Sequence, residues 1–378
     1  MNPPPLNALV IGAGPSGLAC AACLKRAGHR SGINVTILDA ADRIGNAWHH
    51  HYDRLHLHTA RTRSGLPHRP MPKRYGRYPT RADMVEYLAD YADAFNLAPR
   101  LGITVTSVRP DGAGWSVTHS GGTDHADNVI FATGLNGTAY RPDVPGLDSY
   151  TGTTLHSSAY RNAVPFAGQS VLVVGFGNSG GDIALDLAEA GVKVALSVRG
   201  PVNILPHELF GIPITSMGGL RKIMPYRWAD ALTAPILRAK IGRPEDYGLK
   251  SAGKGPAAQV IEDGRVPLID IGTLRAIKAG QIAVHGGIDL IDGSEVRFAN
   301  GQSTPFDSIV FATGYRTDLR AVLPDTPKAL TAAGHPITCG APGPVPGLYF
   351  CSYKASADGQ LNQSGTEAMA IAKAIVAG

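Results

Sequence analysis

Cysteine, clustered basic charge and long apolar runs are all scarce in this chain of 378 residues. Its four cysteines, Cys20, Cys23, Cys339 and Cys351, are too few and too scattered for a disulfide framework. The net charge is only +5 and no Lys/Arg run exceeds two residues, which argues against nucleic-acid binding. No apolar stretch approaches the ~18 residues of a transmembrane helix, and the N-terminus lacks signal-peptide features. We therefore expect a cytoplasmic enzyme without stable membrane insertion, acting with a small anionic substrate or cofactor.

Glycine, by contrast, is plentiful, and some of it lies in the stretch "NALVIGAGPSGLACAACL". This stretch predicts a strand over residues 6–11, a turn over 12–17 and a helix ending at Gly28. In the turn, Gly12 permits a tight bend, Gly14 lets a pyrophosphate approach the backbone, and Gly17 allows close helix–strand packing. A second strand closes on Asp39, whose carboxylate can hold a ribose hydroxyl. The unit predicts an adenine-dinucleotide site.

The same pattern returns in "SVLVVGFGNSGGDIA", with Gly175, Gly177 and Gly180 in the turn. Its second strand ends in "LSVRG", so Arg199 stands where an acidic residue would serve NAD. An arginine there suits a 2′-phosphate and favours NADPH over NADH, although a surface charge without a ligand is the alternative interpretation. FAD at the first loop and NADPH at the second is the simplest assignment.

Each βαβ unit is followed by a predicted hairpin and by a strand ending in Ala-Thr-Gly, "VIFATG" and "IVFATGY". We therefore expect an α/β fold of two Rossmann-like domains, the NADPH domain inserted into the FAD domain. The expected bounds are 1–155 with 315–378 for FAD, and 156–314 for NADPH. The latter carries a Pro-broken helical insert at about 201–265, whose basic amphipathic stretch "GLRKIMPYRWADALTAPILRAK" we expect to cover the active-site entrance rather than to dock on a membrane. A helix capped by Thr80 and a last helix from about Gly365 are also predicted.

Between the two units, "YTGTTLHSSAY" places Tyr150, Gly152, His156 and Tyr160 at the spacing of FxGxxxHxxx(Y/F), the signature of class B flavin monooxygenases. With "GAGPSGLA", "YDRLHLHT", "YPTRADMVEYLADYA", "VLVVGFGNSGGDIALDL" and "FDSIVFATGYRTD", the chain resembles a flavin-containing monooxygenase. It most resembles the YUCCA-type indole-3-pyruvate monooxygenases and their bacterial relatives. The likeness covers residues 8 to 320.

The resemblance implies that NADPH reduces FAD, that O2 then forms a flavin C4a-(hydro)peroxide, and that this species oxygenates a small organic substrate. An aromatic 2-keto acid is implied if the chemistry is YUCCA-like, with sulfides or amines second. It implies catalytic roles for His58, which replaces the Asn of the family's YxxLxxN, and for Asn178, which orients nicotinamide or ribose. Trp48 and His58 would lie near the isoalloxazine, Val105 would contact adenine through its backbone, and the N-terminus of the last helix would face the flavin. The residues expected to contact the cofactors are Gly12, Gly14, Pro15, Ser16, Gly17, Asp39, Trp48, Thr59, Val105, Ala132, Thr133, Gly134, Gly175, Gly177, Asn178, Ser179, Gly180, Arg199, Thr313, Gly314 and Gln363.

Two other function classes fit the pattern. One is an NADPH-dependent flavoprotein reductase or oxidase that oxygenates nothing, and the other is a non-catalytic nucleotide sensor. Cys20 and Cys23 form a CxxC, but their place on the first helix favours core packing over redox chemistry. The segment "WHHHYDRLHLHT" is rich in histidine, but no Cys or carboxylate pair completes a ligand set, so we expect no metal. The sequence leaves the oligomeric state open, a homodimer included.

Overall fold

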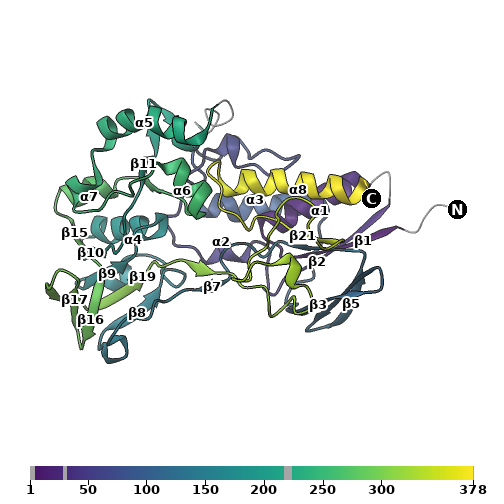
Figure 1. The fold of residues 1–378 in the computed structure, drawn as a ribbon, viewed down its shortest axis with the longest axis horizontal. Coiled ribbons are helices and arrows are strands. Elements are labelled where there is room, and N and C mark those ends of the chain that lie inside the picture. Colours follow the sequence, from purple (N-terminus) through teal and green to yellow (C-terminus); the bar gives the residue numbers. More distant parts are fainter. Residues whose placement is uncertain (1–4, 29–31, 217–223, 378) are drawn as a thin grey trace. The chain divides into compact units, whose positions relative to one another are not determined.

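The structure is a computed structural model that describes residues 5–28, 32–216 and 224–377 (Figure 1). The chain divides into two compact units. Unit 1 comprises Met1–His49, Thr59–Thr138 and Tyr315–Gly378, and unit 2 comprises His50–His58 and Ala139–Gly314. The sequence predicts residues 50–58 and 139–155 in the first domain. They fall in unit 2, partly because β8 (Thr153–His156) pairs with β19 (Ser308–Phe311) of that unit.

Unit 1 is built on a parallel sheet in the order β2-β1-β6-β21. Its strands are β1 (Leu6–Ile11), β2 (Ile33–Leu38), β6 (Asn128–Phe131) and β21 (Leu348–Phe350). On one face, α1 (Pro15–Gly28) lies side by side with α8 (Gln360–Ala377). On the other face, residues such as Leu9 and Phe131 pack on Trp115 and Val117. These belong to an antiparallel sheet of β3 (Val105–Asp111), β4 (Gly114–His119) and β5 (Gly122–Ala126).

Unit 2 repeats this arrangement around a parallel sheet in the order β15-β10-β9-β19-β8. Three of its strands are β9 (Ser170–Val174), β10 (Lys193–Ser197) and β15 (Ile282–His285). Because strand side chains alternate, Val171 and Val173 share a core with α4 (Asn178–Glu189), whereas Leu172 packs on the opposite face. That face carries an antiparallel sheet of β16 (Ile288–Asp292), β17 (Glu295–Phe298) and β18 (Ser303–Pro305). The predicted α/β class with two Rossmann-type halves is confirmed.

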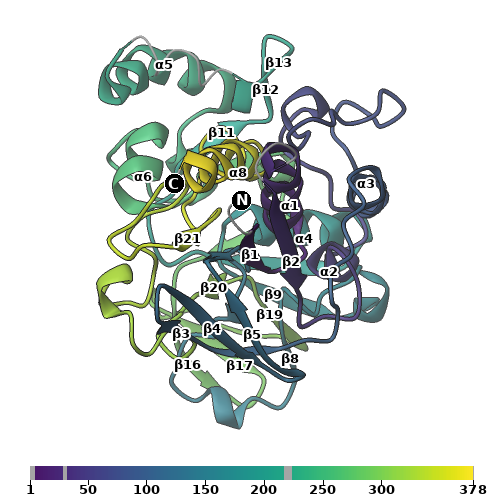
Figure 2. The same cartoon turned by 90° about the vertical axis from the view of Figure 1, so that its right-hand side faces the viewer.

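The insert of unit 2 is less helical than predicted. It begins with β11 (Ile204–Pro206), β12 (Glu208–Leu209) and β13 (Ile212–Pro213), and β11 pairs with β14 (Leu268–Asp270). The backbone of these segments pairs with other strands, β11 with β14 and β12 with β13, so the helical prediction is wrong here. Helices follow at α5 (Tyr226–Ile241), α6 (Pro256–Asp263) and α7 (Thr273–Lys278), with α5 lying against α6 (Figure 2). Residues 219–223 of the predicted basic stretch lie outside the described residues.

The last helix begins at Gln360 rather than near Gly365. The amide of Gln363 donates to the carbonyl of Gly359 at 3.1 Å, which places Gly365 in the second turn. Gly365 faces Pro67, where a Cβ atom would lie 3.1 Å from the proline ring. The glycine therefore serves close packing and does not mark the helix start.

The helix predicted after Thr80 is confirmed as α3 (Arg81–Ala94). Other elements of the described residues include α2 (Asn46–His50), the two-residue strands β7 (Thr138–Ala139) and β20 (Tyr315–Arg316), and 3₁₀ turns at Arg61–Arg63, Leu147–Ser149, Val164–Phe166, Pro244–Tyr247 and Pro327–Ala329. Among the described helices, none combines the length and apolar character needed to cross a bilayer.

Candidate functional site

The first glycine loop joins β1 to α1 in unit 1. Gly12 has φ +114°, and a Cβ there would lie 2.6 Å from the carbonyl oxygen of Ala132. A Cβ on Gly17 would lie 1.8 Å from the carbonyl oxygen of Gly12, so helix and strand meet without space for a side chain. Around Gly14, by contrast, a Cβ would meet nothing within 4 Å. The loop therefore leaves an open backbone cradle at the N-terminus of α1, which suits a pyrophosphate.

The second loop, between β9 and α4 in unit 2, has the same geometry. Gly175 has φ +105°, and its Cβ would lie 2.5 Å from the carbonyl oxygen of Ala312. A Cβ on Gly180 would lie 2.2 Å from the carbonyl oxygen of Gly175, and one on Gly177 would meet nothing within 4 Å. Each unit thus presents one dinucleotide cradle of the same build.

The two ribose ends differ. In unit 1 the amide of Gly12 donates to Leu38, the last residue of β2, and Asp39 follows. Asp39 accepts hydrogen bonds from the amide of Ala13 at 2.5 Å and from that of Ala41 at 2.8 Å. In unit 2 the amide of Gly175 donates to Ser197, so the residue equivalent to Asp39 is Val198.

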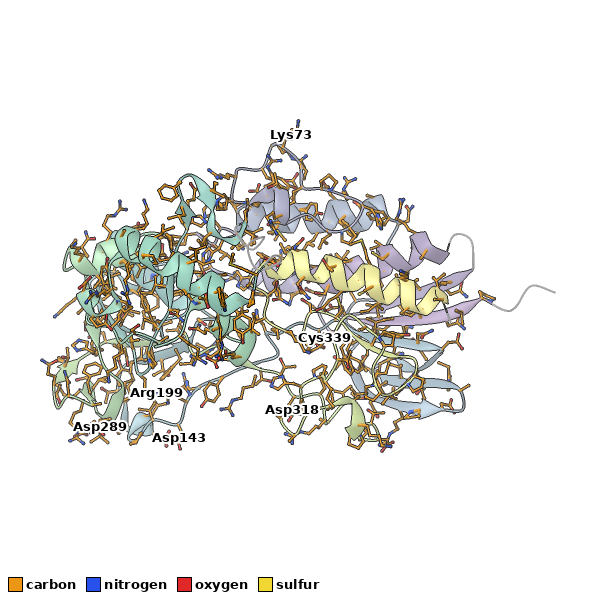
Figure 3. All side chains as sticks on the ribbon, turned by 45° about the horizontal axis from the view of Figure 1, so that its top comes forward. Lys73, Asp143, Arg199, Asp289, Asp318 and Cys339 are labelled. Carbon is orange, nitrogen blue, oxygen red and sulfur yellow. The ribbon has the colours of Figure 1, made fainter. Side chains whose placement is uncertain are left out.

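Arg199 follows Val198 and is exposed (Figure 3). It stands one position beyond the place expected from sequence. Its side chain lies over Gly287, where a Cβ would come within 3.1 Å of the arginine Cγ. No carboxylate occupies the acidic position of this loop, and the cation beside it suits a 2′-phosphate.

The Ala-Thr-Gly ends of β6 and β19 lie beside the two cradles. The carbonyls of Ala132 and Ala312 close against the first glycine of each loop, as described above. Thr133 Oγ1 lies 2.6 Å from Tyr353 Oη, and Thr313 Oγ1 donates to the carbonyl of Tyr140. Gly134 and Gly314 have φ of +80° and +78°, which glycine adopts without strain.

The signature segment around His156 includes β8, the edge strand of the parallel sheet of unit 2. A Cβ on Gly152 would lie 2.4 Å from the carbonyl oxygen of Asp307, and Tyr150 Oη donates to the carbonyl of Phe306 at 2.8 Å. The Nε2 atom of His156 lies 3.0 Å from the carbonyl oxygen of Gly314, at the end of the Ala-Thr-Gly strand. Burial lowers the pKa of His156, so the neutral ring can serve as a donor at this carbonyl near pH 7. The signature residues thus fix the strand end beside the second cradle.

His58 belongs to unit 2, where it lies next to α4. Its Nε2 atom is 3.7 Å from Asp182 Oδ2 and has no hydrogen-bond partner within the described residues. Asp182 is only 4% exposed and accepts a hydrogen bond from Tyr52 Oη at 2.7 Å. Burial, and then the Asp182 charge, raise the pKa of Tyr52 well above its usual value, so Tyr52 remains a donor. Sequence reasoning missed Asp182, because nothing in "GGDIALDL" distinguishes it from an ordinary helix residue.

Asn178, the first residue of α4, uses its side chain within the protein. Its Oδ1 accepts from the amide of Ile269 at 2.8 Å, and its Nδ2 donates to the carbonyl of Pro267 at 3.4 Å. The amide therefore ties the segment before α7 to the second cradle. The role of Asn178 toward nicotinamide or ribose stays a prediction, as does that of the exposed Ser179.

A serine network that sequence reasoning missed links the first loop to α8. Ser16 Oγ lies 3.0 Å from Ser364 Oγ, which in turn lies 2.8 Å from Ser352 Oγ. Gln360 donates to Ser352 Oγ at 2.6 Å. Ser352 has φ +70°, an uncommon conformation for a residue with a side chain. No local motif signals the contact between the first loop and α8, because 348 residues separate Ser16 from Ser364.

The remaining residues that were predicted to contact the cofactors lie on several separate elements. In unit 1, Trp48 lies on α2 and Val105 opens β3. Thr59 Oγ1 lies 2.7 Å from Ser64 Oγ, and Gln363 donates to Glu367 at 2.8 Å. Because Trp48 belongs to unit 1 and His58 to unit 2, their common position at an isoalloxazine stays a prediction.

The cysteines form no disulfide and the histidines join no cluster of metal ligands in the part of the chain that the structure describes. Cys20 and Cys23 are buried, as the core interpretation predicted, and neither forms a disulfide. Burial raises the pKa of the Cys23 thiol to about 12, which leaves it without thiolate at neutral pH. Over the same described ranges, no three His, Cys, Asp or Glu side chains gather as metal ligands.

Two dinucleotide cradles, one on each Rossmann-type half, are the arrangement of flavoprotein oxidoreductases that bind both a flavin and a nicotinamide dinucleotide. The pyridine nucleotide-disulphide oxidoreductase family matches residues 9–205. The chain is 37% identical to indole-3-pyruvate monooxygenase YUCCA1 of Oryza sativa subsp. japonica, over 87% of this chain and 81% of that protein. It is 37% identical to indole-3-pyruvate monooxygenase YUCCA6 of Arabidopsis thaliana, over 87% and 80%. A solved structure, a double mutant of a flavin monooxygenase from Stenotrophomonas maltophilia, is 25% identical with a TM-score of 0.75, covering 99% of both chains.

The chain belongs to the class B flavin-dependent monooxygenases. Its cofactors are FAD and NADPH, its co-substrate is O2, and it oxygenates a small organic molecule. The reductase alternative is not favoured, and the buried thiol of Cys23 agrees with that result.

Proposed function

We propose that this monooxygenase acts on an aromatic 2-keto acid and releases the carboxylic acid that is one carbon shorter. The observation that carries the proposal is the 37% identity, over 87% of the chain, to an indole-3-pyruvate monooxygenase. In the balanced reaction, the keto acid, O2, NADPH and one proton give the shortened acid, CO2, NADP⁺ and water. One oxygen atom enters the new carboxylate, and the other leaves as water.

We further propose that FAD lies in the cradle of unit 1 and NADPH in that of unit 2. FAD would supply electron transfer and oxygen activation. The open backbone at Gly14 and Gly177 would bind the two pyrophosphates. Asp39 would accept from the FAD ribose, and Arg199 would pair with the 2′-phosphate of NADPH.

The other residue roles are proposed on the same basis. His58, held beside the buried Asp182, is the candidate to contact substrate or to hold a proton near the reacting oxygen. Tyr52 would donate its hydrogen bond to Asp182 while His58 contacts the substrate. We propose a cytoplasmic location, which the disulfide-free cysteines support.

Product analysis tests the reaction directly. The FAD-loaded protein is incubated with NADPH and phenylpyruvate under ¹⁸O2, and the products are analysed by mass spectrometry. We expect phenylacetate that carries one ¹⁸O atom and CO2 in equal amount to the NADPH consumed. Oxidation of NADPH with no labelled acid would refute the keto-acid proposal. Labelled sulfoxide or N-oxide from a parallel panel of sulfides and amines would transfer the activity to that substrate class.

A further inference from the structure

A cavity of about 600 Å³ lies within the insert of unit 2, between α5 and the segment from Gly242 to Glu262. Small-molecule sites in proteins have volumes of roughly 300–1,000 Å³. No residue of the second glycine loop lines this cavity, and Arg199 does not line it either. The cavity is therefore distinct from the cradle for NADPH.

One wall of the cavity is a helical stripe on α5. Residues three and four positions apart line it, among them Ala231, Ala234, Leu237 and Ile241. Apolar side chains across the cavity include Ile204 and Leu274, and Tyr247 lies at the C-terminal end of α5. Such walls suit an apolar or aromatic body.

The acidic groups at the cavity are already engaged. Asp230 accepts from the amides of Ala257 and Ala258 at 3.0 and 2.9 Å. Glu262 pairs with Arg227 at 2.7 Å and with Lys254 at 3.4 Å.

Two further cations at the cavity, Arg238 and Arg243, have no ion-pair partner among the described residues. Both of these arginines also line an adjoining hollow of about 380 Å³, together with Ser251 and Glu245. Glu245 accepts from the amide of Ser251 at 3.2 Å. The cavity thus combines apolar walls with two guanidinium groups at one end, and a single carboxylate, that of Glu245, lines the adjoining hollow with them. Guanidinium is the group best suited to carboxylates.

We infer that this cavity binds a small carboxylate with an apolar or aromatic body. The apolar wall of α5 favours such a ligand over a bare phosphate, which would have no use for it. The substrate and product proposed above belong to this chemical class, but the inference does not depend on that reaction, because the cavity lies apart from the cradle.

Calorimetry on the FAD-loaded protein, with NADP⁺ saturating, tests the site with phenylacetate as the probe. In the variant with Arg238→Gln and Arg243→Gln we expect affinity at this site to fall at least about tenfold, because both charge-assisted contacts are lost. Ala234→Leu places a larger side chain in the cavity without changing its charge, and it should also lower the affinity for phenylacetate. Phenylacetamide, which is neutral, should bind the wild type more weakly than phenylacetate. The matched control is Arg297→Gln, whose guanidinium pairs with Asp289 at 3.0 Å and does not line the cavity.

Three results would overturn the inference. The first is no saturable binding of phenylacetate to the wild type. The second is binding whose affinity and stoichiometry are unchanged in the arginine and Ala234 variants, which would place the ligand elsewhere. The third is displacement of phenylacetate by inorganic phosphate at equal concentration, which would assign the arginines to a phosphate site. Turnover of phenylpyruvate by the arginine variant is measured separately, so that loss of the proposed reaction and loss of this site are distinguished.

Discussion

At the scale of single residues, the two glycine types of each cradle should behave differently. A Cβ on Gly180 would lie 2.2 Å from the carbonyl oxygen of Gly175, so Gly180→Ala should force the helix and strand apart. We expect it to lower the free energy of unfolding by about 1–3 kcal/mol, measured by denaturant titration. Gly177→Ala meets no atom within 4 Å and should cost at most about 1 kcal/mol as a helix N-cap change.

The same pair of variants tests the proposed NADPH site. In Gly177→Ala the added methyl would occupy the cradle, so we expect the Kd for NADP⁺ to rise at least about tenfold while the fold is retained. Gly14→Ala should do the same for FAD in unit 1, because that position is equally open. Unchanged affinity for NADP⁺ in folded Gly177→Ala would contradict the assignment of this loop.

Arg199→Ala should separate the two nicotinamide cofactors. If the guanidinium pairs with the 2′-phosphate, the KM for NADPH should rise about 10- to 100-fold, whereas the KM for NADH should hardly change. The control is Arg297→Ala, at an exposed ion pair of the same unit. Equal losses with both cofactors would show that Arg199 has no role at the phosphate.

The residues that sequence could predict are those whose role is set by the local backbone. The first glycine of each loop adopts a positive φ, and the third lies where a Cβ would not fit. The GxGxxG spacing predicts both requirements. Asp182 and Ser364 could not be predicted, because their roles depend on partners far away in the chain. Tyr52 is 130 residues from Asp182, and no sequence pattern records that contact.

At the scale of single elements, α3 illustrates a helix start determined by its first residues. Thr80 Oγ1 accepts from the amide of Asp83 at 3.0 Å, and Asp83 accepts from the amide of Thr80 at 2.8 Å. Thr80→Ala should remove half of this capping box and lower the free energy of unfolding by about 1 kcal/mol. Thr80→Ser should retain most of it.

Thr366→Ala is the matched control for the cap. Thr366 is exposed within α8, where its Oγ1 donates to the carbonyl of Asn362, and alanine is the better helix former. We expect no loss of stability there. An equal loss in the two alanine variants, measured by chemical denaturation, would refute a special role for the cap.

Elements were predictable where periodicity and caps agreed, as in β1 and α3. Prediction was wrong where one strong residue suggested a boundary that packing overrode. Gly365 suggested a helix start, yet it lies inside α8, where the close approach of Pro67 leaves no space for a side chain. In the insert, proline punctuation suggested broken helices, but the segment at Ile204–Pro206 pairs with β14 across more than sixty residues of chain. Strand partners at that separation leave no local signal.

At the scale of the whole molecule, the repeated order of βαβ unit, hairpin and Ala-Thr-Gly strand was enough to predict two similar halves. This repeated order could not predict that His50–His58 belong to unit 2, although the residues before and after them belong to unit 1. That assignment depends on contacts of Tyr52, which shares a core with Tyr160 and Val171. The family's YxxLxxN segment is thus built into the unit that carries the second cradle.

The tyrosines of both units predict how the stability of the molecule depends on pH. Burial raises the pKa of Tyr87 to about 12, and it raises the pKa of Tyr91, Tyr160 and Tyr353 as well. An unfolded tyrosine loses its proton near pH 10, whereas these folded phenols keep theirs. The unfolded state therefore binds fewer protons above about pH 10, and folding stability, fully present below that pH, is lost as the pH rises further.

Each such tyrosine should contribute a slope of up to about 1.4 kcal/mol per pH unit above pH 10, measured by urea unfolding at a series of pH values. Tyr87→Phe should reduce the pH dependence of the free energy of unfolding by up to the contribution of one tyrosine, about 1.4 kcal/mol per pH unit. It should also lower stability at neutral pH, because the amide of Leu66 loses its 2.7 Å contact with Tyr87 Oη. The slope and the neutral-pH loss are thus separable in one variant. If phenolate absorbance reached the full value for 13 tyrosines while circular dichroism still reported the native fold, the buried phenols would be titrating in place and the linkage would be wrong.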